Sequence, residues 1–384
     1  PKTVYSSHYG PIVDLSSISP ALGWNAQTAI SYRDANDKNY TVLDQWLAIN
    51  AADSTDAVIS AFEKYQGNPW ANTIMVDKDG DATYTDASNT PKLKPTAETY
   101  VRHAVVSPQL APMWQKGAGS VLIPGNSSTF EWVEENNGLN KIANAPQLDN
   151  KNYVFNANSS HWLSNLETPL NGYSIMYGPE GTERSARTRY NAQLISDLSG
   201  TGYAGIDNKF SLAELQSVMT DNRSLYSTDF KDQLVAHCGG NPTYNLNGTD
   251  VDLSTACAVL ANWDGHYNSD SNGAHIMREF LQQYRVNDHT ALSADLFSSG
   301  FDVTKPAVTP TGLNTTGASE ALATAVKRLQ DLGISLNSPL GELQYVIKNG
   351  ERISVDGGYS YEGMMNMMET KIPSLSVGEA VMQM

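Results

Sequence analysis

The chain contains the stretch Asn156-Ala157-Asn158-Ser159-Ser160-His161-Trp162, which places two carboxamide side chains in one short polar segment. A second polar stretch, Ser185-Ala186-Arg187-Thr188-Arg189-Tyr190, follows it and supplies guanidinium groups. An enzyme that stabilises an oxyanion needs donors of these types, aimed at the place where negative charge develops. The two stretches are therefore candidates for a catalytic site. The alternative is that Asn156 and Asn158 are turn residues that bond to their own backbone.

The composition is that of a globular protein with room for a large core. The chain has 384 residues, of which 40% are hydrophobic and 17% charged. A formal net charge of −16 repels phosphate backbones, so we expect no nucleic-acid partner. No stretch has the length and apolarity of a membrane-spanning helix, and we expect no membrane partner. No signal peptide is recognisable, but a processed chain would look the same.

The two cysteines, Cys238 and Cys257, lie in segments with a helical pattern, on either side of a polar loop rich in Gly and Asn. Two free buried thiols and one disulfide both fit this arrangement. The disulfide is favoured, and it would imply an oxidising compartment. Neither cysteine has a histidine at metal-ligand spacing, so no zinc site is predicted.

Hydrophobic periodicity predicts a chain with both strands and helices. Short strand patterns fill residues 1–40, a helical period runs through 41–64, and residues 72–84 are typical of a β-hairpin. The stretch 86–150 has few periodic segments and is expected to wrap the surface. Amphipathic helices are predicted at Leu212–Met219, Phe230–His237, Ser254–Trp263, Ala274–Tyr284 and Ala318–Leu332, before a strand pattern at Leu343–Ile347.

Several blocks resemble, in colinear order, the penicillin acylase family of N-terminal nucleophile (Ntn) hydrolases. Within that family they look most like the acyl-homoserine lactone and aculeacin acylases. Any one block is a weak signal, but their shared order over nearly the whole chain is specific. Besides the two stretches quoted first, the blocks are Tyr5–Val13, Tyr32–Asn36, Val42–Trp46, Gln66–Thr73, Ala256–Asp264 and Gly341–Gln344.

The resemblance implies an α+β fold, the four-layer αββα sandwich of the Ntn hydrolases, with a mainly helical lobe. Residues 1–190 would hold a portion of the αββα core with the acyl pocket and the oxyanion segment. Residues 191–340 would form the helical lobe, and 341–384 would return to the core sheet. The family nucleophile is a serine at the start of the β chain, whose own α-amino group is the base. Pro1 has no hydroxyl or thiol, so this chain is expected to be an interior portion of the β chain.

Two residues correspond to the catalytic machinery of the family. Asn158 would donate to the oxyanion, together with a backbone amide expected on the upstream segment that carries the serine. Arg187 would lie near the amine of that serine and keep it neutral, and therefore able to accept a proton. The alternative for Arg187 is a solvated helix face, and Asn156 is expected to be structural.

The resemblance also implies a pocket for an acyl chain. Trp46 and Trp70 match pocket positions, where a flat indole gives an aliphatic chain an apolar wall. Each CH₂ group buried there would contribute about 0.8 kcal/mol. Ala71 would extend the wall, and His161 lies close enough in sequence to touch substrate. Trp46 fits ordinary core packing equally well, because it lies on the apolar stripe of a predicted helix.

No cofactor is expected. The run Asp77-Lys78-Asp79-Gly80-Asp81 resembles the first half of a calcium loop, but no glutamate completes it. A plain Asp-Gly turn is favoured, with calcium as the minor alternative. The chain has no Gly-x-Ser-x-Gly motif, so His8, His161 and His266 are not expected to form a Ser-His-Asp triad.

By resemblance, the chain belongs to an amide hydrolase that removes the acyl chain from N-acyl homoserine lactones or lipopeptides through an acyl-serine intermediate. Such an enzyme would mature from a zymogen, quench quorum signals, and work in the periplasm or outside the cell. Its partners would be the small acyl amide, the α subunit and the rest of the β chain. The alternatives are a penicillin- or cephalosporin-type acylase and a catalytically silent acyl-binding homologue, which Pro1 supports.

Overall fold

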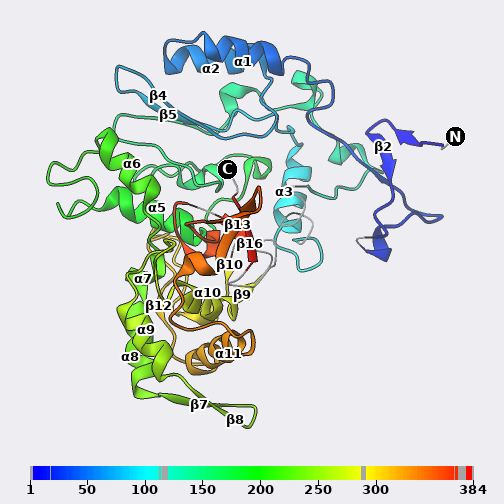
Figure 1. The fold of residues 1–384 in the computed structure, drawn as a ribbon. Helices are drawn as coiled ribbons and strands as arrows, with labels where there is room; N and C mark the ends of the chain where they lie inside the picture. Colours follow the sequence, from blue (N-terminus) through cyan, green and yellow to red (C-terminus); the bar gives the residue numbers. More distant parts are fainter. Residues whose placement is uncertain are drawn as a thin grey trace. The chain divides into compact units, whose positions relative to one another are not determined.

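The computed structural model describes residues 3–17, 19–111, 114, 120–286, 291–366, 368–370 and 378–382. The chain divides into two compact units, residues 1–180 (unit 1) and 181–384 (unit 2) (Figure 1). The finer division predicted at 190 and 340 stays a prediction. Both units contain helices and strands, as the α+β class requires.

The described residues of unit 1 form two antiparallel sheets of three strands each and three α-helices. The sheets are β1 (Ser6–Ser7), β2 (Gly10–Val13) and β3 (Ile30–Ser31), and β4 (Thr73–Val76), β5 (Ala82–Thr85) and β6 (Gln147–Asn150). The helices are α1 (Val42–Asn50), α2 (Thr55–Tyr65) and α3 (Pro95–Ala104), and the 3₁₀ turns are η1 (Pro20–Leu22), η2 (Ser128–Phe130), η3 (Glu135–Gly138), η4 (Ile142–Asn144), η5 (His161–Leu163) and η6 (Ile175–Tyr177).

The helical period at 41–64 corresponds to two helices, α1 and α2, which lie side by side (Figure 1). Ser54 caps α2, as expected, because its side chain accepts a hydrogen bond from the Ala57 amide at 3.2 Å. The predicted hairpin is also present as β4 and β5, and its turn begins at Asp77. These local signals lie in cap and turn residues, which explains why the sequence predicts them well.

One expectation for unit 1 is wrong. The stretch 86–150 does not only wrap the surface, because α3 lies within it and buries Ala97 and Val101 beside Ile175. Ala97, Tyr100, Val101 and Ala104 recur at helical spacing, so the sequence carries a signal for this helix that the expectation overlooked. The apolar stripe of α1 also points outward, since Gln45 is the buried residue of this helix and Trp46 is 52% exposed. Within this chain Trp46 therefore does not pack into a core, and its place in an acyl pocket stays a prediction.

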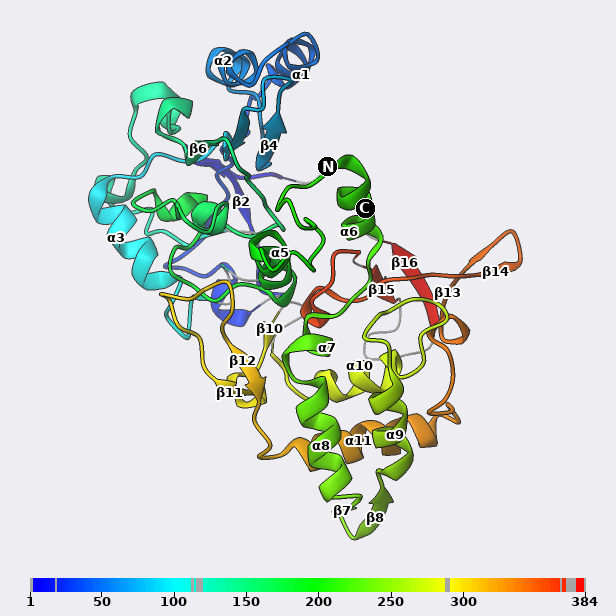
Figure 2. The same ribbon diagram turned by 90° about the vertical axis from the view of Figure 1, so that its left-hand side faces the viewer.

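Unit 2 contains most of the helices. The amphipathic helices predicted between 212 and 332 are confirmed, and α8, α9 and α11 gather with the β7–β8 hairpin at one end of the unit (Figure 2). The apolar faces of α8, α9, α10 and α11 share one continuous core, which includes Leu234, Leu260, Phe280 and Leu322. The helices are α5 (Ala186–Ser196), α6 (Leu212–Thr220), α7 (Leu225–Asp229), α8 (Lys231–Gly240), α9 (Ser254–Asn262), α10 (Ala274–Gln282) and α11 (Ala318–Asp331).

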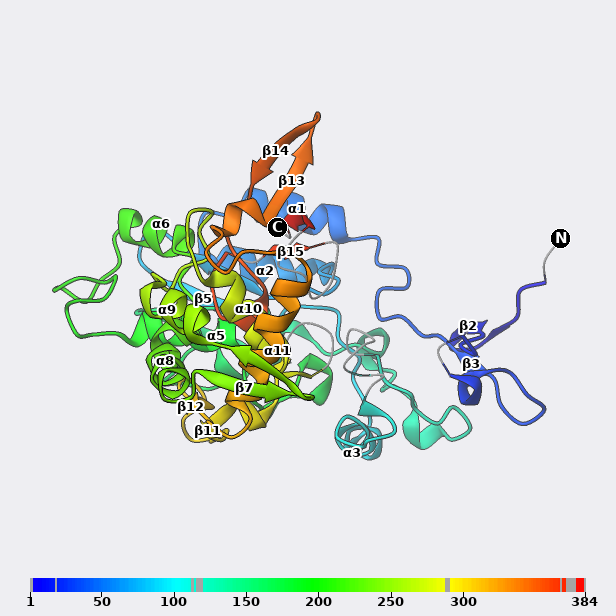
Figure 3. The ribbon, with the colours of Figure 1, turned by 60° about the horizontal axis from the view of Figure 1, so that its bottom comes forward.

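The strands of unit 2 form small sheets. In the sheet of order β14-β13-β16-β15, the β13–β16 pair is parallel and the other pairs are antiparallel. The β13–β14 hairpin extends beyond the rest of the unit (Figure 3). The strands are β7 (Thr243–Leu246), β8 (Thr249–Asp252), β9 (Arg285–Val286), β10 (Ala291–Leu292), β11 (Phe297–Ser299), β12 (Thr311–Leu313), β13 (Gln344–Lys348), β14 (Glu351–Ser354), β15 (Met368–Thr370) and β16 (Gly378–Met382), and the 3₁₀ turns are η7 (Ala294–Leu296), η8 (Leu340–Glu342) and η9 (Ser360–Glu362).

A disulfide joins Cys238 in α8 to Cys257 in α9, with a Cα–Cα distance of 6.0 Å. The favoured alternative for the two cysteines is thus the one present in the structure. The bond closes the segment that contains the β7–β8 hairpin. Within the part of the chain that the structure describes, no helix has the length and apolarity needed to cross a membrane.

Candidate active site

The loop that carries Asn158 is built around Asn156. The Asn156 side-chain oxygen accepts from the Asn158 amide at 2.9 Å, and its Nδ2 donates to the Ser159 carbonyl at 3.0 Å. Asn158 itself is exposed and has a φ of +60°, in the left-handed region that asparagine tolerates better than most residues. Asn156 therefore shapes the loop and Asn158 is presented at the surface. This arrangement agrees with the structural role expected for Asn156.

His161 lies at the end of this loop and is fully buried. Its Nε2 lies 3.1 Å from Oε1 of Glu180, and its ring meets those of Tyr173 and Tyr177 edge to face, at centroid distances of 5.3 and 6.5 Å. A buried imidazole bonded to a carboxylate stabilises a loop. The predicted contact between His161 and substrate stays a prediction.

Glu180 is the hydrogen-bond acceptor at the centre of this region. Burial alone would raise the pKa of its carboxyl group, but the amides of Gly172 and Tyr173 and the imidazole of His161 lower that pKa below its ordinary value. The two amides donate to Glu180 at 3.0 and 2.9 Å. Nearby Asp86 behaves differently, since burial raises the pKa of its carboxyl group despite the bonds from Ser88.

Arg187 lies in the first turn of α5, in unit 2. Ser185 caps this helix by accepting from the Thr188 amide at 3.2 Å, and burial lowers the pKa of the Arg187 guanidinium. The two neighbouring arginines are buried, and Arg189 donates to the Pro310 carbonyl and lies 5.5 Å from the Phe297 ring centroid. A solvated helix face is therefore the wrong description of this cluster. The predicted site residues thus divide between the units, with Asn158 in unit 1 and Arg187 in unit 2.

Trp46 and Trp70 are both on the surface of unit 1. Trp70 is 80% exposed, and Leu43 and Leu47 extend the apolar face of α1 beside Trp46. The adjoining Ala71 is exposed as well. An exposed indole is the type of group that binds an aliphatic chain.

One hydrogen bond connects the helix of Trp46 to the segment of Trp70. The buried Gln45 accepts from the Gly67 amide at 2.6 Å through its side-chain oxygen. A Cβ atom at Gly67 would lie 2.9 Å from backbone atoms of Thr41 and Val42, so only glycine permits this close approach. Sequence reasoning missed Gln45, although a glutamine among the apolar residues of a helix is a usable signal.

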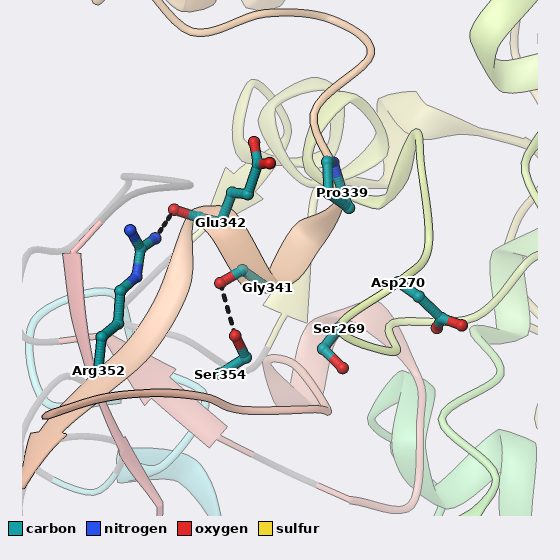
Figure 4. Close-up of a pocket in the computed structure, with 7 residues that line it drawn as sticks. All are labelled: Ser269, Asp270, Pro339, Gly341, Glu342, Arg352 and Ser354. Carbon is teal, nitrogen blue, oxygen red and sulfur yellow. Dashed lines mark hydrogen bonds between the residues drawn. The ribbon is translucent and has the colours of Figure 1, made fainter.

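Two pockets in unit 2 contain neither Asn158 nor Arg187. The larger one, of about 480 Å³, is an open polar groove in unit 2, where Arg352 donates to the Glu342 carbonyl and Ser354 Oγ to the Gly341 carbonyl at 2.9 Å (Figure 4). The other, of about 210 Å³, lies under the first turn of α5 beside Arg189. The groove is lined by Ser269, Asp270, Pro339, Gly341, Glu342, Arg352 and Ser354.

The aspartates of the β4–β5 turn form hydrogen bonds and ion pairs within the turn and with neighbouring lysines. Asp77 Oδ1 accepts from the amides of Asp79 and Asp81 at 3.0 and 3.1 Å, which lowers the pKa of Asp77. Asp79 pairs with Lys78 at 2.6 Å, and Asp81 pairs with Lys151. The described residues contain no cluster of three or more His, Cys, Asp or Glu side chains arranged for a metal ion. A plain Asp-Gly turn explains the geometry, and the expectation of no cofactor stays a prediction.

The chain is similar to known acylases. It is 28% identical over 380 residues to the acyl-homoserine lactone acylase PvdQ of Pseudomonas syringae pv. syringae (strain B728a). The alignment covers 96% of this chain and 45% of that protein. It is 29% identical over 374 residues to the aculeacin-A acylase of Actinoplanes utahensis, over 96% of this chain and 45% of that protein. The chain therefore spans about half the length of the curated relatives it matches.

Among solved structures, the chain is similar to the thermostable penicillin G acylase from Alcaligenes faecalis, with a TM-score of 0.48 and 15% identity over 87% of this chain and 59% of that chain. The sequence model of the Penicillin amidase family matches residues 1–380. Because this match covers nearly the whole chain, the chain belongs to the penicillin amidase family, whose Ntn-hydrolase fold class the sequence predicts.

Proposed function

We propose that this chain carries part of the active site of an amide hydrolase that removes an acyl chain from a small amine. The substrates are N-acyl homoserine lactones or acylated lipopeptides, in keeping with the names of the two relatives. The nucleophile is a serine on the remaining part of the β chain, and the α subunit completes the protein. A penicillin-type acylase is the runner-up within the same chemistry.

The reaction has two acyl-transfer steps. The serine hydroxyl attacks the amide carbonyl while the α-amino group takes its proton, and the tetrahedral oxyanion collapses as the protonated amine leaves. Water then attacks the acyl-serine ester through a second oxyanion and releases the fatty acid. The part that this chain performs in both steps is to donate a hydrogen bond from Asn158 to the oxyanion.

The observation that carries the proposal is the division of roles between Asn156 and Asn158. Both ends of the Asn156 carboxamide bond within the loop, and Asn158 lies at the surface on a backbone bent into the left-handed region. An uncharged amide held on a rigid loop is suited to stabilise charge that forms only in the transition state. Removal of such a donor lowers kcat roughly 10²- to 10³-fold.

Two further features support the assignment. The apolar face of α1 with Trp46, together with the exposed Trp70, offers an acyl chain a wall from which water is displaced. Arg187 is partly removed from water by burial, so its charge acts on a nearby amine more strongly than a solvated guanidinium would. Maturation from a zymogen in the periplasm or outside the cell fits the disulfide between Cys238 and Cys257.

The experiment uses the complete precursor, expressed with its own processing. Release of free homoserine lactone from short- and long-chain N-acyl substrates is followed by mass spectrometry, with Asn158→Gly as the comparison. We expect release by the wild type and a loss in kcat for the variant. Binding of the acyl chain without any release would replace the proposal with the acyl-binding homologue. Preferred cleavage of penicillins would replace it with the penicillin-type acylase.

A further inference from the structure

Residues 178–180, here called the clamp segment, contact the loop that carries Asn158 through Ser160 and His161. We propose that Glu180 is a positioning residue for the oxyanion donor, acting through His161, and that Gly178 and Pro179 fix the same loop through Ser160. This inference rests on the proposed function, because it specifies what keeps Asn158 in place during the reaction.

The backbones of the loop and the clamp segment approach each other closely. Ser160 Oγ donates to the Pro179 carbonyl at 2.6 Å. A Cβ atom at Gly178 would lie 2.8 Å from the Ser160 Cβ, and the φ of Gly178 is +127°. Both facts require glycine at this position. The contact therefore sets the separation of the two segments.

Backbone amides outside the loop fix the orientation of the Glu180 carboxylate. Its Oε1 accepts from the Tyr173 amide at 2.9 Å and its Oε2 from the Gly172 amide at 3.0 Å, so the plane of the carboxylate is set by backbone groups. Oε1 also accepts from His161 Nε2 at 3.1 Å. Since the His161 ring is fully buried against Tyr173 and Tyr177, this bond holds its orientation.

The restraint reaches Asn158 through a short, stiff piece of chain. Phe155 before the loop is bonded through its amide to the Ser164 carbonyl at 2.9 Å, beyond His161. Inside the loop, Asn156 bonds to Asn158 and Ser159. A displacement of His161 or Ser160 would therefore also displace Asn158. Catalysis is sensitive to such a shift, because a misplacement of about 1 Å can cost roughly 100-fold in rate.

Glu180→Gln is the informative change. A glutamine keeps the shape but has one oxygen and one NH₂ group, whereas the glutamate uses both oxygens to accept from Gly172, Tyr173 and His161. In the complete protein, we expect kcat to fall about 10- to 100-fold with KM nearly unchanged, because oxyanion geometry acts in the transition state. In an Asn158→Gly background, the same change should cost nothing further, since the donor that it positions is already gone.

Glu98→Gln is the matched control. Glu98 is also a unit 1 carboxylate that accepts from the backbone and side chain of an adjoining segment, from the Ile175 amide at 2.6 Å and Ser174 Oγ at 2.7 Å. We expect this variant to keep the wild-type kcat. Should Glu180→Gln fail to fold, Ser160→Ala tests the same clamp, and its smaller loss in kcat should likewise vanish in the Asn158→Gly background.

Three results would overturn the inference while the proposed function stands. They are a wild-type kcat for Glu180→Gln, a loss that adds in full to that of Asn158→Gly, or an equal loss for Glu98→Gln. If the wild type releases no amine, the proposed function fails, and hydrogen exchange still tests the clamp. Faster exchange of the amides at 157–160 in Glu180→Gln alone supports it, and unchanged exchange overturns it.

Discussion

Arg278 and Glu362 form a bidentate ion pair in the core of unit 2, and both side chains are fully buried. Arg278 Nε donates to Oε1 at 2.9 Å and Nη2 to Oε2 at 3.2 Å. Nη1 donates to Gln344 at 2.8 Å, and the Tyr359 amide donates to Glu362 at 2.6 Å. The pair thus joins α10 to β13 and η9, which lie far apart in the sequence.

Breaking this pair should destabilise unit 2 strongly. Glu362→Gln leaves the Arg278 guanidinium buried without its counter-charge, and we expect the free energy of unfolding to fall by about 3–5 kcal/mol in urea titrations. The exposed pair Lys327–Asp331 is the control, where Asp331→Asn should cost less than about 1 kcal/mol. Equal effects of the two changes would show that the buried pair does not hold the three elements together.

We expect the free energy of unfolding to fall in mild acid, because the buried His275 becomes protonated there. Burial, the largest cause, and the charge of Arg278 lower its pKa, the bond to the Ser335 carbonyl opposes them, and the net result is a pKa of about 4 against an ordinary 6.5. The unfolded chain therefore binds more protons between these two pH values. The stabilisation is complete above pH 6.5 and is lost as the pH falls towards 4.

The measurement is the free energy of unfolding of the wild type and His275→Gln as a function of pH. The difference between the two should change by about 3 kcal/mol from pH 6.5 to pH 4. Taking the difference removes the contribution of the carboxyl groups, which titrate in both proteins. Parallel curves would mean that His275 accepts a proton without disturbing the fold.

Asn158→Gly should remove the hydrogen-bond donor while keeping the backbone conformation of the loop. Glycine adopts a φ of +60° without strain, so the thermal midpoint should stay near that of the wild type. We expect kcat for amide hydrolysis to fall roughly 10²- to 10³-fold with little change in KM. A loss confined to KM would indicate that Asn158 binds the substrate rather than the transition state.

Trp70→Ala should change the preference for acyl-chain length. Because the side chain is 80% exposed, we expect little effect on stability, and kcat/KM should fall more for long-chain than for short-chain substrates. Leu332→Ala, at an exposed apolar position in unit 2, is a control that should leave the chain-length profile unchanged. An equal fall for all chain lengths would place Trp70 outside the acyl site.

The sequence predicts best the elements whose signals are local. The helices α10 and α11 have regular apolar faces, and Ser54 and the Asp77 turn mark boundaries through their own side chains. It fails where packing overrides the pattern. The apolar face of α1 is exposed because the polar Gln45 turns inward to bind Gly67.

For the candidate site, the resemblance predicts roles for Asn158 and Arg187, which stay predictions, and it predicts none for Glu180. The bond between Glu180 and His161 joins residues 19 positions apart through a chain without regular period. No pattern of hydrophobic residues or spacing marks such a contact. Only the folded backbone brings the carboxylate to the loop, which explains why sequence reasoning missed this residue.

The left-handed backbone at Asn158 also limits what evolution can place there. Glycine and aspartate accept that conformation but provide no uncharged N–H donor, while glutamine has the donor but does not favour the conformation. Under the proposed oxyanion role, asparagine meets both demands with a short, uncharged side chain. A library with every amino acid at this position, selected only for folding, should be enriched in Asn, Gly and Asp, and the same library selected for activity should be enriched in Asn over Gly and Asp.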